Sequence, residues 1–327
     1  MLVDSFHRHI TYLRLSLTDR CNLRCRYCMP EGGVEKLDHS QVLTYEEFLR
    51  VAQAAASAGV TKIRLTGGEP LVRKDIINFI RELARVPGVL DLRLTTNGVL
   101  LPRMARNLLQ AGIKRVNVSL DSLDRETYRR LTGCDEFETV WRGIETALAE
   151  GFDQVKINCV PIRGYNEQEI LDFARLTLNR PLEVRFIEFM PLGYSSFWSE
   201  DKVVSALEIK EQLSRLGELT PEPRRHTEGP AQVYRLTGAK GAVGFISPIT
   251  DHFCGTCNRL RLTADGKLRL CLLSRNEIDL KSHLRNGAGP EEIVKLLEEA
   301  VRLKPKGHPL DKDHYASGRR TMNLIGG

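Results

Sequence analysis

Short apolar runs alternate with helical patterns along the first two thirds of the chain. Six of these runs have the length and the aliphatic content of buried strands. The predicted strands are Tyr12–Leu17, Lys62–Leu65, Leu90–Leu94, Arg115–Leu120, Val155–Val160 and Leu182–Phe189. Segments in which apolar residues recur at helical spacing lie between most of these strands. This β-α-β-α order predicts parallel strands with helices packed outside, either as a barrel or as an open sheet.

The helical segments between the strands have recognisable ends. Thr44 followed by Glu47 predicts a capping box, and Gly59 predicts the end of the same helix. Further helices are predicted at Asp75–Ala84, Leu100–Gln110, Phe137–Ala149 and Glu167–Leu178.

The alternation stops near Pro221, where we expect a second domain to begin. The strands predicted beyond it are Val233–Leu236, Ala242–Ile246, Arg259–Leu262 and Lys267–Leu270, and the helices are Glu277–Leu284 and Glu291–Leu303. Ala264-Asp265-Gly266 predicts a hairpin turn between the last two strands. We therefore predict two domains, 1–220 and 221–327, which agrees with a length of 327 residues at about 150 per domain.

Composition narrows the class of protein. With 42% apolar and 28% charged residues, the chain is typical of a folded soluble protein. It has no apolar run of about 18 residues and no signal-peptide core, so we expect a cytoplasmic protein without membrane contact. The net charge is +6, and the segment Arg224–Arg275 alone has nine basic and three acidic residues. This segment favours a local anion site, with a solvated basic face as the alternative.

The eight cysteines are too few for a disulfide framework in a chain of this length, and their grouping suggests metal sites. Cys21, Cys25 and Cys28 form a Cys-x3-Cys-x2-Cys loop directly after the first strand. Three close thiolates on one loop suit three corners of a 4Fe–4S cluster, with the fourth iron left open. A zinc knuckle completed by His39 is the alternative.

A second group, Cys254, Cys257 and Cys271, has the spacing Cys-x2-Cys-x13-Cys. It too leaves a fourth ligand position open, although a structural zinc finger completed by His252 or His283 remains an alternative. Arg259 and Arg261 alternate with leucine and can therefore face the same side of a strand. Two guanidinium groups beside an open iron site would make a good receptor for phosphates.

The loop CNLRCRYCMP resembles the signature of the radical S-adenosylmethionine superfamily. The resemblance implies that its three cysteines bind a 4Fe–4S cluster whose open iron chelates S-adenosylmethionine. It also implies four contacts with that molecule, from Tyr27 in the loop, Gly68 in GGEP, Ser119 in VSLDS and Met190 in IEFMP.

With the second cysteine group, the chain resembles the GTP 3′,8-cyclase family over nearly its entire length. The implied fold is α/β, a partial six-unit (β/α) barrel of the TIM type. A C-terminal α+β domain with a second 4Fe–4S cluster would close it. The implied GTP contacts are Arg14, Arg64, Thr95, Lys156, Arg259, Leu260 and Arg261. Cys134 and Cys159 match no ligand of the family, so we read them as ordinary buried or semi-buried thiols. The tail RTMNLIGG resembles one whose paired glycines enter the active site.

The resemblance implies an enzyme that converts GTP to 3′,8-cyclo-7,8-dihydro-GTP, the first step of molybdenum cofactor biosynthesis. The radical would come from S-adenosylmethionine, and no side chain would act as a catalytic acid or base. The implied partners are flavodoxin or ferredoxin as electron donor, cyclic pyranopterin monophosphate synthase as recipient of the product, and a second copy in a homodimer.

Two other functions fit parts of the sequence. Radical enzymes that modify peptides or sulfatases also carry auxiliary clusters, but they generally have more cysteines in the C-terminal region than the three found here. A zinc-containing RNA-binding protein would need aromatic residues among its basic ones. Aromatic residues make up only 6% of the chain and do not interleave with basic residues, so no nucleic acid is expected as a partner.

Overall fold

The computed structural model describes residues 1–327 apart from 30–32, 193–196, 224–228, 309–319 and 327. Within these residues twelve strands form one sheet, in the order β12-β11-β10-β1-β2-β3-β4-β5-β6-β9-β8-β7. The strands from β10 to β9 in this order all run parallel. In sheet order they are β10 Arg259–Leu262, β1 Tyr12–Ser16, β2 Lys62–Thr66, β3 Asp91–Thr96, β4 Arg115–Ser119, β5 Gln154–Cys159, β6 Glu183–Ile187 and β9 Ala242–Ile246.

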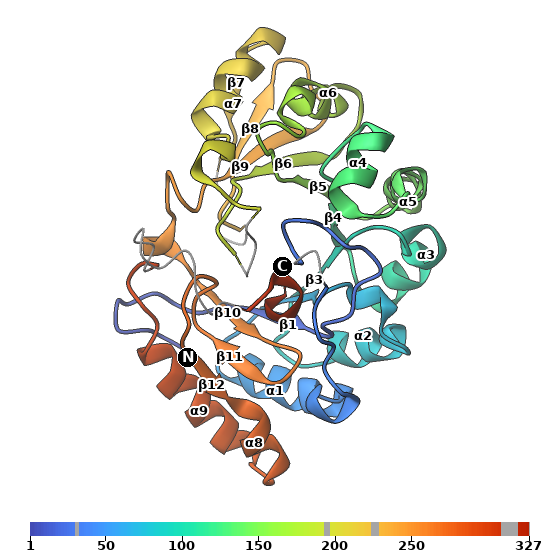
Figure 1. The fold of residues 1–327 in the computed structure, drawn as a ribbon. Helices are drawn as coiled ribbons and strands as arrows, with labels where there is room; N and C mark the ends of the chain where they lie inside the picture. The colour runs from blue at the N-terminus through green and yellow to red at the C-terminus, as the bar shows by residue number, and fades with distance from the viewer. Residues whose placement is uncertain (30–32, 193–196, 224–228, 309–319, 327) are drawn as a thin grey trace.

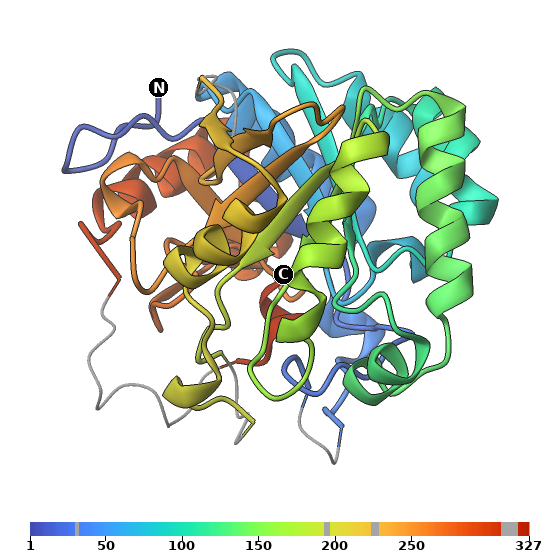
Figure 2. The same cartoon turned by 90° about the horizontal axis from the view of Figure 1, so that it is seen from above.

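The parallel strands curve around a central space, and the helices lie outside them (Figure 1). The helices in chain order are α1 Tyr45–Ser57, α2 Ile76–Ala84, α3 Leu101–Ala111, α4 Arg125–Thr132, α5 Phe137–Glu150, α6 Ile170–Asn179, α7 Ala206–Leu213, α8 Leu280–Arg285, α9 Pro290–Arg302 and α10 Met322–Ile325. The short C-terminal α10 lies on the inner side of the strands (Figures 1 and 2). The last described residues therefore lie inside the barrel.

The alternation of side chains along each strand explains this arrangement. In β1, Leu13 and Leu15 are fully buried in the same hydrophobic core as Phe48 and Val51 of α1. Successive side chains in a strand point to opposite faces, so the residues that alternate with these leucines face the centre of the barrel. The helices thus cover an apolar outer face, while the inner face is free to carry polar side chains.

The six predicted strands and the α/β arrangement of parallel strands with helices outside are confirmed. The sheet also extends beyond the six predicted units, because β10 pairs in parallel with β1 and β9 with β6. Antiparallel strands lie outside these two, with β11 Lys267–Arg269 and β12 Glu277–Asp279 beyond β10, and β8 Gln232–Leu236 and β7 Leu219–Pro221 beyond β9. The domain boundary at residue 220 stays a prediction, and one sheet runs through both parts.

Local predictions hold with one correction. Thr44 and Glu47 form the predicted capping box of α1, and the turn 264–266 joins β10 to β11. The helix predicted over Glu277–Leu284 is wrong at its start, because residues 277–279 form β12. Asp279 ends the strand and caps α8, since its side chain accepts a hydrogen bond from the Ser282 amide at 3.2 Å.

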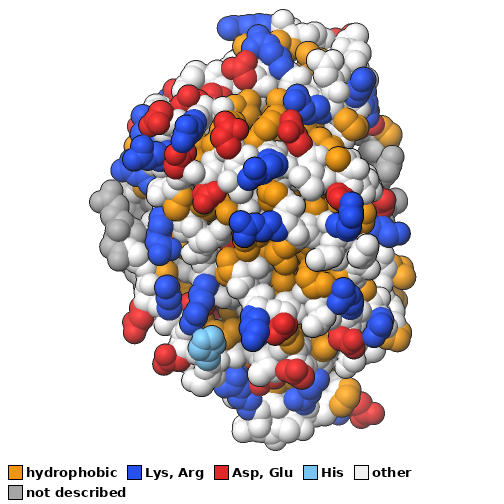
Figure 3. Space-filling view, turned by 90° about the vertical axis from the view of Figure 1, so that its right-hand side faces the viewer, with side chains coloured by type: hydrophobic (Ala, Val, Ile, Leu, Met, Phe, Trp, Pro, Cys, Tyr) orange, Lys and Arg blue, Asp and Glu red, His pale blue; other side chains and the backbone are white. Residues whose placement is uncertain are grey.

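The outer surface over α3 and α5 mixes basic, acidic and apolar side chains (Figure 3). On this face the two signs of charge are interspersed. Among the described residues, no helix is both long and apolar enough to cross a membrane.

Candidate active site

The barrel encloses a cavity of about 330 Å³, and all six cysteines of the two predicted groups line it. Strand register places the groups at opposite ends. Cys21, Cys25 and Cys28 follow the carboxyl end of β1. Cys254 and Cys257 precede β10, whose first residue pairs with the first residue of β1, and Cys271 follows the antiparallel β11. Because β1 has five residues, the two ends are about 16 Å apart.

The first cysteine loop is held by backbone hydrogen bonds to the end of α4. The amides of Arg24 and Arg26 donate to the carbonyls of Thr132 and Leu131, at 2.8 and 2.9 Å. Within the loop, the Cys28 amide donates to the Cys25 carbonyl at 2.9 Å. Burial raises the pKa of the Cys28 thiol to about 12, so a metal would have to displace its proton.

The predicted S-adenosylmethionine contacts line the same cavity as the cysteines of this loop. Tyr27 donates a hydrogen bond to Asp121 at 2.5 Å, and Gly68, Ser119 and Met190 all line the same cavity. The Gly68 amide donates to the Thr18 carbonyl at 2.7 Å. A Cβ atom at Gly68 would lie 2.5 Å from the Arg20 carbonyl oxygen, so close packing against the loop requires glycine here.

The second cysteine group lies among positive charges. Burial raises the pKa of Cys257, but the charges of Arg259 and Lys304 outweigh it and lower the pKa to about 6. Lys304 is buried and donates to the carbonyl oxygens of Arg259 and Leu270, which lie in β10 and directly after β11. It therefore ties together the two segments that carry Cys257 and Cys271.

The zinc alternatives each need a histidine as the fourth ligand. In the described residues, no three His, Cys, Asp or Glu side chains converge as ligands of one metal ion. His39 is exposed and its ring lies 3.4 Å from Arg20, while His283 lies on α8 beside Glu292. His252 does line the cavity near Cys254.

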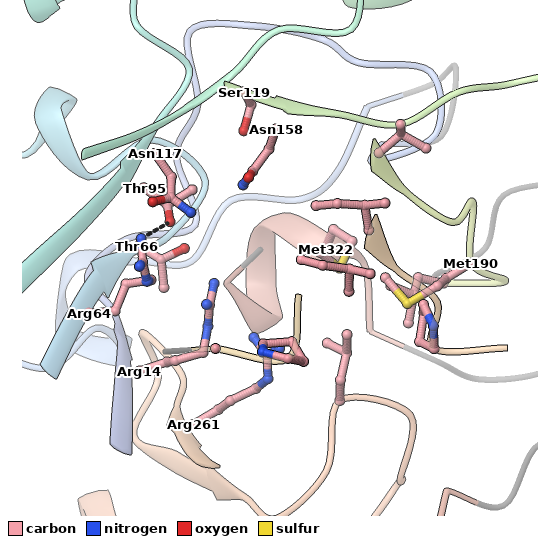
Figure 4. A pocket seen from close by; sticks show the side chains of 18 of the residues that line it. Arg14, Arg64, Thr66, Thr95, Asn117, Ser119, Asn158, Met190, Arg261 and Met322 are labelled. Carbon is pink, nitrogen blue, oxygen red and sulfur yellow. Dashed lines mark hydrogen bonds between the residues drawn. The ribbon is translucent and has the colours of Figure 1, made fainter. Parts of the chain in front are cut away.

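Six arginines line the cavity between the two groups, and four of them are predicted substrate contacts. Arg14, Arg64 and Arg261 point toward a common region (Figure 4), and Arg259 lines the same cavity. Arg64 donates to the Tyr12 hydroxyl at 2.6 Å and to Thr95 Oγ1 at 3.1 Å. Burial, together with the charges of Arg14 and Arg259, holds the pKa of Arg261 well below its usual range. Such crowding of cations would be relieved by a bound anion.

Two predicted substrate residues lie differently from the arginines. Lys156 is buried inside the barrel and forms an ion pair with Glu183 at 2.6 Å, without reaching the cavity wall. The Leu260 side chain packs in the hydrophobic core on the other face of β10. Any contact of Leu260 with a ligand would have to come from its backbone.

The C-terminal tail reaches the cavity, as the sequence predicts. Arg261 donates a hydrogen bond to the Gly326 carbonyl at 2.8 Å, and Met322 lines the cavity. Gly326 has φ +86°, and a Cβ atom there would lie 2.7 Å from Ser16 Cβ. Gly327 lies outside the described residues. The slim glycine thus lets the tail lie against the end of β1.

Sequence reasoning missed further inward-facing residues that also line the cavity. Among them are Tyr12, Arg93, Asn117, Asn158 and Arg185. Each lies two residues from a predicted site residue on the same strand or, in the case of Arg185, on the strand next to one. The signal was the period of two along each strand, since every second residue of β1 to β6 faces inward.

The same elements occur together in known proteins. The profile described as Radical SAM superfamily matches residues 15–177, and that described as Molybdenum Cofactor Synthesis C matches residues 182–310. GTP 3′,8-cyclase of Pelotomaculum thermopropionicum is 52% identical over 99% of both chains, and that of Moorella thermoacetica is 50% identical over 99% of both. The chain belongs to the GTP 3′,8-cyclase family.

Membership of the GTP 3′,8-cyclase family removes the peptide-modifying and RNA-binding alternatives. One similar solved structure, SuiB of Streptococcus suis bound to S-adenosylmethionine, has a TM-score of 0.61 and 14% identity, covering 90% of this chain and 68% of that chain. At this identity the likeness concerns the fold alone. A radical S-adenosylmethionine barrel is thus combined with a C-terminal part typical of molybdenum cofactor synthesis.

Proposed function

We propose that this chain converts GTP to 3′,8-cyclo-7,8-dihydro-GTP, the first step of molybdenum cofactor biosynthesis. One observation carries the proposal beyond family membership: a single cavity has three cysteines at each end and six arginines in its wall. A nucleoside triphosphate suits this arrangement, because its phosphates match the arginines and its base can reach one cysteine group.

Six cysteines would hold two 4Fe–4S clusters. Cys21, Cys25 and Cys28 would bind the first, and Cys254, Cys257 and Cys271 the second. S-adenosylmethionine would lie at the first cluster against Tyr27, Gly68, Ser119 and Met190. When bound, the first cluster and S-adenosylmethionine supply the radical chemistry that removes a hydrogen atom from C3′ of the GTP ribose.

The chain itself binds, orients and encloses the substrate. Arg259 and Arg261 would hold the triphosphate from β10, and Arg14 and Arg64 from the adjoining strands. Thr95 would contact GTP beside Arg64, with which it already shares a hydrogen bond. Lys156 would act from behind the cavity wall and Leu260 through its backbone. The tail at Gly326 would help to exclude water, and no side chain would serve as a general acid or base.

The expected partners follow from the family. We infer that flavodoxin or ferredoxin supplies electrons, that cyclic pyranopterin monophosphate synthase takes the product, and that the chain acts as a homodimer in the cytoplasm.

The proposed function is tested by anaerobic reconstitution with iron and sulfide, followed by incubation with GTP, S-adenosylmethionine and a reductant. We expect 5′-deoxyadenosine and a cyclised nucleotide in equal amounts. A fully loaded protein that leaves GTP unchanged while cleaving S-adenosylmethionine would contradict the proposal.

A further inference from the structure

Two side-chain oxygens inside the cavity have no hydrogen-bond partner within the described part of the chain. They are Oδ1 of Asn117 in β4 and Oδ1 of Asn158 in β5. Both side chains lie in the cavity wall (Figure 4). Asn117 is only 6% exposed, so water reaches it poorly. A buried acceptor without a partner is destabilising, and a ligand that donates a hydrogen bond would remove this cost.

The chemistry of these two groups differs from that of the rest of the wall. Arginine side chains only donate hydrogen bonds, and they suit phosphate oxygens. An amide oxygen only accepts, and a fully ionised triphosphate offers it no hydrogen. The part of a nucleotide that faces Asn117 Oδ1 must therefore carry an O–H or N–H group, which the ribose hydroxyls and the base provide.

The register of the strands shows which of the two amides lies beside the proposed GTP site. Asn117 pairs with Thr95 on one side and Lys156 on the other, and both belong to the proposed GTP site. Asn158 pairs instead with Ser119 and Arg185, and Ser119 belongs to the proposed S-adenosylmethionine site. Asn117 precedes Ser119 by two residues on the same strand, so the two side chains share a face about 6.6 Å apart.

The substrate group at this boundary has to be the sugar. The radical forms at the S-adenosylmethionine end and must reach C3′, so the ribose lies nearer to Ser119 than the triphosphate does. We propose that Asn117 accepts a hydrogen bond from a ribose hydroxyl of GTP and thereby positions the sugar at the boundary of the two sites. This inference rests on the proposed function and adds a specificity-determining residue to it.

The test compares the binding of GTP, 2′-deoxy-GTP and 3′-deoxy-GTP by calorimetry to the anaerobic, cluster-loaded protein. Wild type should bind at least one deoxy analogue on the order of tenfold more weakly than GTP. Asn117→Ala should bind GTP and that analogue equally. Asn158→Ala is the matched control, because it removes the neighbouring amide, and it should keep the wild-type ratio.

The possible failures are distinguishable. If wild type does not bind GTP at all, the proposed function is wrong. If wild type binds GTP but binds both analogues as tightly, the role of Asn117 is wrong whatever the fate of the variant. Discrimination that survives in a folded Asn117→Ala protein would also overturn it, while leaving the proposed function intact.

Discussion

Arg261 shows how one residue can link the substrate site to the end of the chain. Its guanidinium group is buried among other cations and donates to the Gly326 carbonyl. A single carbonyl oxygen uses only part of the five donors of a guanidinium group. The remaining donors suit a phosphate, so Arg261 can hold the tail and the nucleotide together.

We predict that Arg261→Ala weakens GTP binding by about 1.5–3 kcal/mol, or ten- to a hundred-fold. A charge-assisted contact to phosphate contributes more than a neutral hydrogen bond, which explains the size of the effect. Calorimetry with GTP measures it, and guanosine is the control ligand. Guanosine lacks phosphates and should bind both proteins equally poorly, whereas an unchanged GTP affinity in a folded, loaded variant would refute the phosphate contact.

Only some of the residues on the inner face of the barrel could be assigned to the site from the sequence. Arg14, Arg64 and Arg261 could be placed in the cavity because family motifs accompany them. No family motif accompanies Asn117, and only its spacing of two residues from Ser119 indicates that it faces inward. The ion pair of Lys156 with Glu183 depends on the register between β5 and β6, which the sequence does not specify.

At the scale of elements, β10 and β11 with α9 form the support of the second cysteine group. Lys304, directly after α9, crosses from the helix to both strands and donates to a carbonyl in each segment. Its burial lowers its pKa, whereas the negative charge of the Cys257 and Cys271 thiolates raises it. The position of Cys257 relative to Cys271 thus depends on a side chain from a third element.

We predict that Lys304→Met lowers the free energy of unfolding by roughly 1–3 kcal/mol, because two buried carbonyl groups lose their donor. The iron retained by the second cysteine group should fall, while the first group keeps its iron. Denaturant unfolding and iron analysis measure these effects. Lys306→Met, two residues away and exposed, is the control and should change neither quantity. Equal iron loss from both groups in the Lys304 variant would argue against the local support.

The strands of the barrel were predictable, but the extension of their sheet by β10 and β9 was not. Leu13 and Leu15 in β1 repeat a pattern seen in every early strand, because helices cover the outer face. The parallel pairing of β10 with β1 joins segments more than 200 residues apart, and such pairing leaves no local period in the sequence. The sequence pattern did not predict α4, because its many charged residues obscure the apolar periodicity of the helix. Asp124 nevertheless caps α4, since its side chain accepts a hydrogen bond from the Thr127 amide at 2.8 Å.

At the scale of the whole molecule, the proposed function requires one cavity whose two ends differ in their chemistry. Replacing Cys254, Cys257 and Cys271 together by alanine should halve the iron content and abolish cyclisation of GTP. Reductive cleavage of S-adenosylmethionine should persist, because its proposed site lies wholly at the first cysteine group. Iron analysis and chromatography of 5′-deoxyadenosine measure the two outcomes.

The matched controls are the two cysteines outside the groups. Cys159 is buried and Cys134 is half-buried, and Cys159→Ala and Cys134→Ala should each leave the iron content unchanged. Full iron content in the triple variant would contradict the assignment of a second cluster, and loss of 5′-deoxyadenosine in the folded variant would contradict the separation of roles.

The central claim is that the cavity holds the GTP ribose at the S-adenosylmethionine end and the base toward the second cysteine group. The most direct measurement uses GTP that carries deuterium at C3′ with the loaded wild-type protein. If the claim holds, mass spectrometry will find the deuterium in 5′-deoxyadenosine and the cyclised product will have lost it. Unlabelled 5′-deoxyadenosine, formed together with product that keeps the deuterium, would show that the sugar is held elsewhere.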